Sequence, residues 1–311
     1  MSRFFTAARL SNKVLCTGVH SMRFGSSLSK DSSLCKKIAV IGGGQMAEAI
    51  LNAVIQDKIQ SADTIHVYDI NKERVKFLSA RYGMTAAKSV QECVEGAEIV
   101  MLAVKPQNID DLSAMLTEPV NGMVLSIVAG CPISVLKEKF KTNVVMRTMP
   151  NTPSMISEGM TVWTTSPETS DELRKKGEKL LGSIGEQIEV ADEKYLDMAT
   201  AISGSGPAYV FLTMESMIDA AVHMGFPREV ATKLVLTTLR GSSSYALQAG
   251  SSVHTLKSNV TSPAGTTASA LYQLEAGGFR TVVADAVWAA YRKALELGGQ
   301  SSNVGPGRYK W

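Results

Sequence analysis

A short apolar run that ends in three glycines constrains the fold of this 311-residue chain more than any other feature. Ile38-Ala39-Val40-Ile41 has the length of a buried strand, and Gly42-Gly43-Gly44 follows it directly. Beyond the glycines, Met46, Ile50 and Val54 recur at the spacing of one helix face. A strand, a glycine turn and a helix in this order predict the first unit of a parallel sheet whose strands are connected by helices.

The same alternation continues to about residue 192. Further strands are expected at 64–68, 99–104, 123–128, 143–147, 160–164 and 187–190. Helical stretches separate most of these runs, so we expect an α/β fold with a Rossmann-type doubly wound sheet that is mostly parallel and covered on both faces.

The pattern changes after residue 192, where no convincing strand follows. Helices are expected at 207–225, 227–248, 267–276 and 279–297. We therefore expect a dinucleotide-binding domain at 36–192, an all-helical domain at 193–299 and a tail at 300–311. The helical half is too short to bury all its own apolar faces, so we expect it to be a dimerisation domain in a homodimer or a higher homo-oligomer.

The first 30 residues hold five of the 32 basic residues, none of the 29 acidic ones and eight Ser or Thr. This composition is typical of an organellar transit peptide, and we expect residues 1–35 to be a mitochondrial leader. The alternative is a disordered extension that carries no targeting signal, on a cytoplasmic protein.

The rest of the chain is close to neutral, which excludes a basic nucleic-acid-binding surface. No run approaches the roughly 18 apolar residues that span a membrane. The four cysteines form no Cys-x-x-Cys pair and have no clustered histidines, so neither a metal site nor a disulfide scaffold is expected. We therefore expect a small-molecule substrate as the partner, with no nucleic acid, membrane or metal.

The run Gly42-Gly43-Gly44-Gln45-Met46-Ala47, directly after Ile41, fits the dinucleotide-binding pattern G-x-G-x-x-A. Gly42 permits the tight turn, Gly44 lets the backbone approach a pyrophosphate, and Ala47 allows close helix–strand packing. Asp69 ends the next strand, where a carboxylate accepts hydrogen bonds from ribose hydroxyls and repels the 2′-phosphate of NADP. Lys72 and Arg74 follow and could neutralise that phosphate instead. The residues alone therefore favour NADH only weakly.

From Lys37 to about Leu297 the chain resembles the pyrroline-5-carboxylate reductase family. The motifs behind this resemblance are GGGQMA, Ala103-Val104-Lys105-Pro106-Gln107, Met149-Pro150-Asn151-Thr152-Pro153, Ser203 to Ala208 and, most specific, Asn259 to Thr267 followed by Gly277-Gly278-Phe279-Arg280. Three positions depart from the common pattern, and one of them is Ser258, where many members carry an acidic residue. Asp69 replaces a small polar residue of many NADPH-preferring members, and Ala264 replaces a glycine.

The resemblance implies the reduction of 1-pyrroline-5-carboxylate to L-proline with NADPH or NADH. It also implies that the Thr267 hydroxyl contacts the substrate ring nitrogen. Substrate binding is then expected at Val260, Ser262, Gly265, Thr266 and Thr267, and the nicotinamide-ribose side at Ala103, Val104, Lys105, Pro106, Val128, Ala129 and Gly130.

Several alternatives remain open at this stage. Ser262 to Thr267 could simply be a Thr/Pro N-cap of a helix. Arg147 and Arg280 could bind a carboxylate or serve in structural pairs. A β-hydroxyacid-type dehydrogenase would need a general-acid lysine in the helical half, where Lys233 is the only lysine of the first two helices. A catalytically silent NAD(P)-binding regulatory protein is the other alternative.

Overall fold

The computed structural model of the protein describes residues 33–306, so the predicted leader lies outside the described residues except for its last three. In this part an eight-stranded sheet has the order β3-β2-β1-β4-β5-β6-β7-β8. The strands are β1 (Ile38–Ile41), β2 (Ile65–Tyr68), β3 (Thr85–Ala86), β4 (Ile99–Leu102), β5 (Met123–Ser126), β6 (Val145–Met149), β7 (Gly159–Thr165) and β8 (Gly185–Glu189). Of the neighbouring pairs, β6 and β7 alone run antiparallel. The mostly parallel doubly wound sheet is confirmed.

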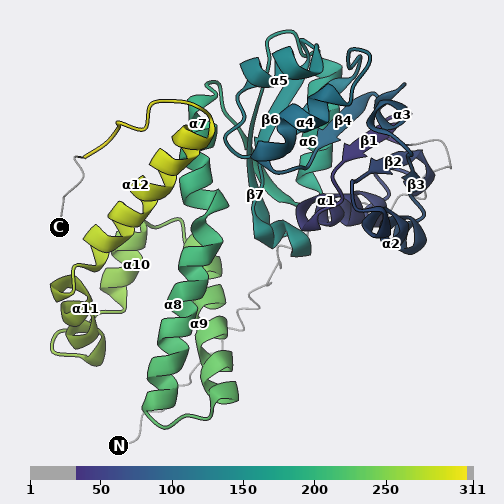
Figure 1. The fold of residues 1–311 in the computed structure, drawn as a ribbon. Coiled ribbons are helices and arrows are strands. Elements are labelled where there is room, and N and C mark those ends of the chain that lie inside the picture. Colours follow the sequence, from purple (N-terminus) through teal and green to yellow (C-terminus); the bar gives the residue numbers. More distant parts are fainter. Residues whose placement is uncertain (1–32, 307–311) are drawn as a thin grey trace, which may run out of the picture. The chain divides into compact units, whose positions relative to one another are not determined.

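Helices cover both faces of this sheet (Figure 1). Side chains from α1 (Gln45–Gln56), α2 (Lys72–Tyr82) and α6 (Asp171–Gly182) contribute to one apolar cluster, and those from α3 (Val90–Val94), α4 (Ile109–Ala114) and α5 (Ile133–Phe140) contribute to the other. Successive residues of a strand point to opposite faces, so Ile38 and Val40 join the first cluster while Ala39 and Ile41 join the second. This explains why β1 is apolar at every position.

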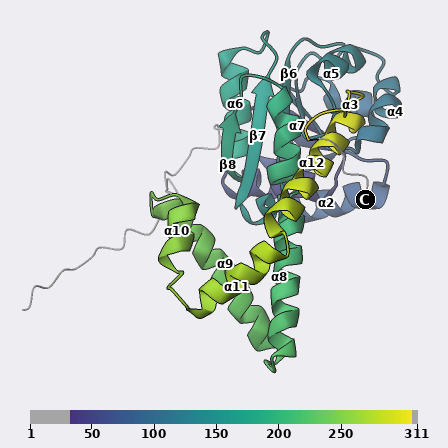
Figure 2. The ribbon, with the colours of Figure 1, turned by 90° about the vertical axis from the view of Figure 1, so that its left-hand side faces the viewer.

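The helical region follows as α7 (Lys194–Ala199), a π-helical turn (Thr200–Gly204), α8 (Gly206–His223), α9 (Arg228–Gln248), α10 (Val253–Asn259), α11 (Thr266–Ala276) and α12 (Phe279–Leu297). The four predicted helices are confirmed within two residues at each end, whereas α7, α10 and the short strand β3 are additions. In Figure 2 α12 runs beside α7 and the start of α8, and the π-helical turn also contacts α12. Among the described residues, no helix is long and apolar enough to cross a membrane.

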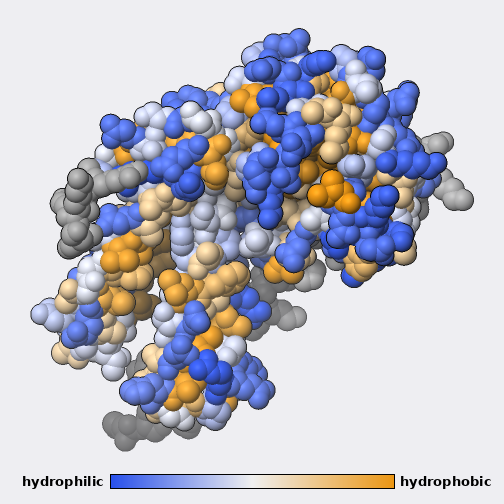
Figure 3. Space-filling view, viewed as in Figure 1, coloured by the Kyte–Doolittle hydropathy of each residue, from blue (hydrophilic) through white to orange (hydrophobic). Residues whose placement is uncertain are grey.

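Large apolar side chains are exposed on the helical region. Examples are Phe211 and Leu212 on α8, Leu234 on α9, and Tyr272 and Val282 on α11 and α12. Figure 3 shows hydrophobic residues gathered over the same elements. Exposed apolar area of this extent is characteristic of a surface that another protein chain covers. The pattern agrees with the predicted association of the helical half with a second copy.

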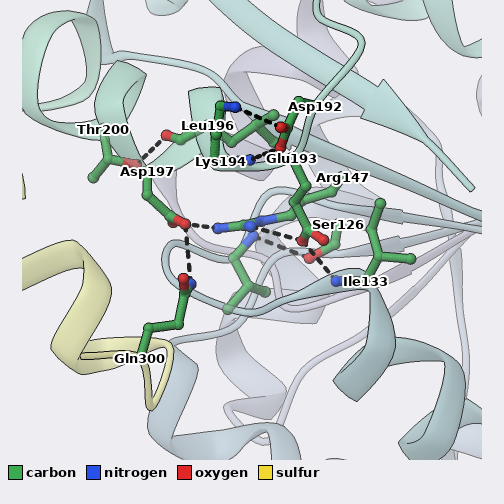
Figure 4. A network of polar contacts seen from close by, with 11 residues as sticks. Ser126, Ile133, Arg147, Asp192, Glu193, Lys194, Leu196, Asp197, Thr200 and Gln300 are labelled. Carbon is green, nitrogen blue, oxygen red and sulfur yellow. Dashed lines mark hydrogen bonds and ion pairs between the residues drawn. The ribbon is translucent and has the colours of Figure 1, made fainter. Parts of the chain in front are cut away.

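A buried ion-pair network joins the sheet to the helical region (Figure 4). The guanidinium of Arg147, on β6, donates to Glu193 at 2.7 Å and to Asp197 at 2.6 Å. Glu193 also accepts from the backbone N–H of Ile133 at 2.7 Å, and Asp197 accepts from Gln300 at 3.1 Å. Four segments of the chain are therefore joined around the Arg147 cation: β6 and the segment of Glu193 and Asp197 directly, and the segments of Ile133 and Gln300 through these two carboxylates. Arg147 serves in a structural pair, which resolves the alternative of a carboxylate-binding role.

Replacing Asp197 with Ala should lower the free energy of unfolding by about 3–5 kcal/mol, because the Arg147 cation remains buried without its closest partner. Denaturant unfolding at a fixed protein concentration measures the effect. Glu193→Ala is the matched control, and a smaller loss is expected because Glu193 is 31% exposed and Asp197 only 1%. Equal losses in the two variants would contradict this account of the network.

Candidate functional site

The glycine turn after β1 is fixed by the ends of two neighbouring strands. The N–H of Gly42 donates to the carbonyl of Tyr68 at 2.8 Å, and the N–H of Ala103 donates to Ile41 at 2.8 Å. Gly42 has a φ of +96°, and a Cβ atom at this position would lie 2.6 Å from the carbonyl oxygen of Ala103. Both facts require glycine here, because an L side chain is strained at this φ and collides with backbone.

Gly44 is a glycine for a different reason. Its φ is −63°, and no atom lies within 4 Å of where its Cβ would be, so neither strain nor packing within the chain requires glycine. Gly44 is the N-cap of α1, and no side chain caps this helix. The first amides of a helix have no partner inside it and carry partial positive charge, so this end can receive an anion.

Asp69 is held at the edge of the same site. One carboxylate oxygen accepts from the N–H of Gly43 at 2.7 Å, and the other accepts from the N–H of Asn71 at 2.8 Å. The Asn71 side chain in turn caps α2 by accepting from Glu73 and Arg74. These contacts fix the carboxylate in one orientation while each oxygen keeps a further lone pair for a ligand.

A cleft of about 510 Å³ opens at this carboxyl edge of the sheet. Its lining comes from the ends of β1, β2 and β4 and from α4, and consists of Ile41, Gly42, Gly44, Tyr68, Asp69, Ile70, Ala103, Val104, Lys105, Gln107, Asn108, Asp111, Leu112 and Met115. The volume falls in the range of small-molecule and cofactor sites, and its place is where ligands bind in open α/β sheets.

The structure thus brings seven of the predicted cofactor residues into one cleft and leaves others beside it. Gln45 is exposed at the start of α1, Met46 is half-buried in the core, and Gly43 gives its N–H to Asp69. Pro106 lies next to the cleft without lining it.

The predicted loop after β5 packs elsewhere. Val128 and Gly130 are buried, and a Cβ on Gly130 would lie 2.8 Å from that of Leu297 at the end of α12. Ala129 is half-buried between them, and none of the three lines the cleft. Their role on the nicotinamide side stays a prediction.

Lys105 lies in the cleft but does not end a buried strand. The strand expected at 99–104 ends at Leu102, and Lys105 is exposed in the connection that follows. The sequence analysis did not predict Asn108, Asp111 and Met115. Ile109, Leu112 and Leu116 recur at the spacing of one helix face, and this signal could have placed α4. Gln107 gave a second signal, because it ends one of the motifs that carry the family resemblance.

The predicted substrate loop leads into a helix, α11, that begins without a side-chain cap. Gly265 is the N-cap of α11, and no side chain caps it, so Ser262 and Thr266 are not acting as helix caps. This disfavours the simple capping interpretation of the loop. Ala264 has a φ of +56°, a left-handed conformation that glycine adopts more easily, in agreement with the glycine that the family resemblance leads us to expect here.

Within one chain the loop does not reach the cleft. None of Val260, Ser262, Gly265, Thr266 and Thr267 is among the residues that line it. Val260 is 66% exposed, and α11 packs mainly against α12. The structure therefore places the two halves of the predicted site at separate positions in a single chain.

Other ionisable groups in the described residues offer no obvious general acid. Burial and the nearby Lys37 lower the pKa of His66, which lies within β2. Burial raises the pKa values of Cys93 and Cys131 to about 11, so both thiols are protonated near neutral pH. Lys233 is exposed on α9 and Arg280 pairs with Glu275, so neither lines the cleft.

Comparison with known proteins identifies both halves of the chain. A family described as pyrroline-5-carboxylate reductase dimerisation matches residues 193–297, and one described as NADP oxidoreductase coenzyme F420-dependent matches residues 37–130. A pyrroline-5-carboxylate reductase of Synechocystis sp. is 36% identical over 263 residues, which cover 84% of this chain and 98% of the relative.

Solved structures also show similarity to pyrroline-5-carboxylate reductases. A pyrroline carboxylate reductase of Plasmodium falciparum with NADP bound is 32% identical, with a TM-score of 0.76. The 1-pyrroline-5-carboxylate reductase of Streptococcus pyogenes is 29% identical, with a TM-score of 0.78. Each comparison covers 84% of this chain and 98% of the other.

The different surroundings of Gly44 and Gly42 predict opposite outcomes when each glycine is replaced with alanine. Gly44→Ala should leave the free energy of unfolding within about 1 kcal/mol of the parent and weaken dinucleotide binding at least about tenfold, because the methyl group enters open space at the helix start. Gly42→Ala should lower the free energy of unfolding by about 1–3 kcal/mol. Thermal unfolding and calorimetric titration with NAD⁺ and NADP⁺ measure the two effects. A Gly44→Ala protein that binds both dinucleotides normally would contradict the assignment of this helix start.

Proposed function

The chain belongs to the pyrroline-5-carboxylate reductase family, and from that premise we propose that it reduces the C=N bond of 1-pyrroline-5-carboxylate to L-proline in a site that two copies of the chain complete. It is an NAD(P)H-dependent oxidoreductase of proline biosynthesis. The observation that carries the proposal is that the predicted substrate loop, Val260 to Thr267, contributes none of the residues that line the cofactor cleft of its own chain.

The residues of the cleft fit a dinucleotide. Gly44 leaves open space at the start of α1 for a pyrophosphate, and Asp69 presents two oriented carboxylate oxygens to ribose hydroxyls. When bound, the reduced cofactor supplies the hydride. Lys105 is best suited to positioning, because a cation close to the imine would discourage its protonation.

The substrate loop supplies the complementary groups. The backbone N–H groups at the start of α11 can hold the substrate carboxylate without a buried cation. By family resemblance the hydroxyl of Thr267 hydrogen-bonds to the ring nitrogen and keeps its proton in place as the imine becomes an amine. The protein therefore needs to orient the substrate more than to transfer a proton.

A second copy supplies the loop to the cleft in this proposal. The loop and the cleft are separate in one chain, the helical faces next to the loop expose large apolar side chains, and residues 193–297 match a dimerisation family. Two copies related by symmetry would bury these faces and complete two equivalent sites.

The proposal includes a mitochondrial location, which rests on the composition of residues 1–35 alone. Fusing these residues to a fluorescent reporter tests this location. Accumulation of the reporter in mitochondria supports mitochondrial targeting, and a diffuse cytoplasmic signal overturns it.

Asp69 should favour NADH over NADPH, because its carboxylate repels a 2′-phosphate. Oxidation of each cofactor in the presence of pyrroline-5-carboxylate, followed optically, gives the two values of kcat/KM. Replacing Asp69 with Ser should shift the ratio towards NADPH by about tenfold. An unchanged ratio of the two kcat/KM values would show that Asp69 does not discriminate between the cofactors at the ribose.

Mixed oligomers test the shared site. Gly44→Val should remove cofactor binding and Thr267→Ala should remove productive substrate binding, so each variant alone should be nearly inactive. In oligomers that contain both chains, isolated by two different affinity tags, one site per pair has both halves intact, and up to about half of the parent activity should return. No recovery would mean that each site is built from one chain.

A further inference from the structure

A carboxylate, a guanidinium and a phenol form a cluster behind the glycine turn. Glu48, on α1, forms an ion pair with Arg74, on α2, and accepts a hydrogen bond from the Tyr82 hydroxyl at 2.7 Å. The Nε–H of Arg74 donates to the carbonyl oxygen of Gly43, so the guanidinium is tied to the cofactor turn itself. The Arg74 guanidinium also lies 5.1 Å from the centre of the Phe77 ring.

This cluster lies next to Asp69. A Cβ placed on Gly43 would lie 3.3 Å from Cγ of Arg74 and 3.6 Å from the carboxylate of Asp69, so the two side chains flank the same glycine. A 2′-phosphate on a ribose bound at Asp69 would therefore lie in the electrostatic field of Arg74. Guanidinium groups bind phosphates strongly where their donors are free.

Glu48 keeps Arg74 from acting in this way. Its charge cancels that of Arg74, and its contact with Nη2 occupies a second donor of the guanidinium. Partial burial acts to raise the pKa of Glu48, but hydrogen bonds from Arg74 and Tyr82 outweigh it and hold the pKa below its ordinary value. Glu48 is thus ionised at neutral pH. The more distant Arg81 remains an exposed cation on α2.

We propose that Glu48 is a specificity-determining residue: by neutralising and holding Arg74, it makes the cofactor cleft discriminate against the 2′-phosphate of NADPH. Asp69 repels this phosphate at close range, and Glu48 withdraws the cation that would compensate. The proposal rests on the assignment of the cleft as the dinucleotide site and of Asp69 as the ribose-binding residue.

Equilibrium binding of NAD⁺ and NADP⁺ to the full-length protein, measured by calorimetry, tests the proposal. Glu48→Gln keeps the shape of the side chain and removes its charge, and it should improve NADP⁺ binding relative to NAD⁺ by about fivefold to tenfold. Adding Arg74→Gln to this variant should abolish the gain. Tyr82→Phe is the matched control, because it removes a hydrogen bond to Glu48 without changing any charge, and the ratio should stay within about twofold.

Two results would overturn the proposal. One is an unchanged ratio of dissociation constants in Glu48→Gln, and the other is a gain that persists after Arg74 is replaced, which would assign the effect to another cation such as Lys72. Turnover with pyrroline-5-carboxylate is measured on the same preparations. Loss of binding selectivity and absence of turnover are then separate results, so the role of Glu48 and the proposed reaction can fail independently.

Discussion

The close approach of Gly42 to the backbone of Ala103 is the constraint on which the rest of the site depends. The end of β1 lies between the ends of β2 and β4, with Gly42 bonded to Tyr68 on one side and packed against Ala103 on the other. No side chain fits there, so the chain must turn directly into α1. The open N-terminus of α1 is thereby fixed at the carboxyl edge of the sheet, beside Asp69. The place of the proposed cofactor site therefore depends on a backbone contact between neighbouring strand ends.

Helices α1 and α11 begin without a side-chain cap in segments assigned to anionic ligands, although α4, α5, α7, α8, α9 and α12 also lack such a cap. Helices elsewhere in the chain, such as α2 and α6, are capped by Asn71 and Ser170. An uncapped start leaves amides for a ligand at some expense in stability of the free protein. The same principle would then serve the pyrophosphate of the cofactor and the carboxylate of the substrate, with no buried cation at either position.

Much of the sheet and the cofactor turn could be predicted from the sequence, because their signals are local. Strands buried on both faces are continuous apolar runs, and the glycine turn has a fixed spacing. The end of β4 was placed two residues late, because the apolar run continues past Leu102 into Ala103 and Val104, which line the cleft and also pack against the core. Strand β3 is two exposed residues long and carries no pattern.

Features that depend on distant contacts could not be predicted in this way. Arg147 had two equal interpretations until the structure placed Glu193 and Asp197 around it. Likewise, Glu48 and Arg74 are separated by 26 residues, and nothing local connects them. The substrate loop was predicted through its resemblance to a family. Its separation from the cleft within one chain could not be predicted, because it depends on how the helices are arranged in space, and local sequence patterns do not show that arrangement.

The central claim is that a hydride from the nicotinamide is delivered to the imine carbon of the substrate. Reaction of the protein with pyrroline-5-carboxylate and a reduced cofactor carrying deuterium at the transferred position of C4, followed by mass spectrometry of the product, tests it directly. The account predicts proline with one deuterium, bound to ring carbon C5. Proline without the label, or no proline at all, would contradict it.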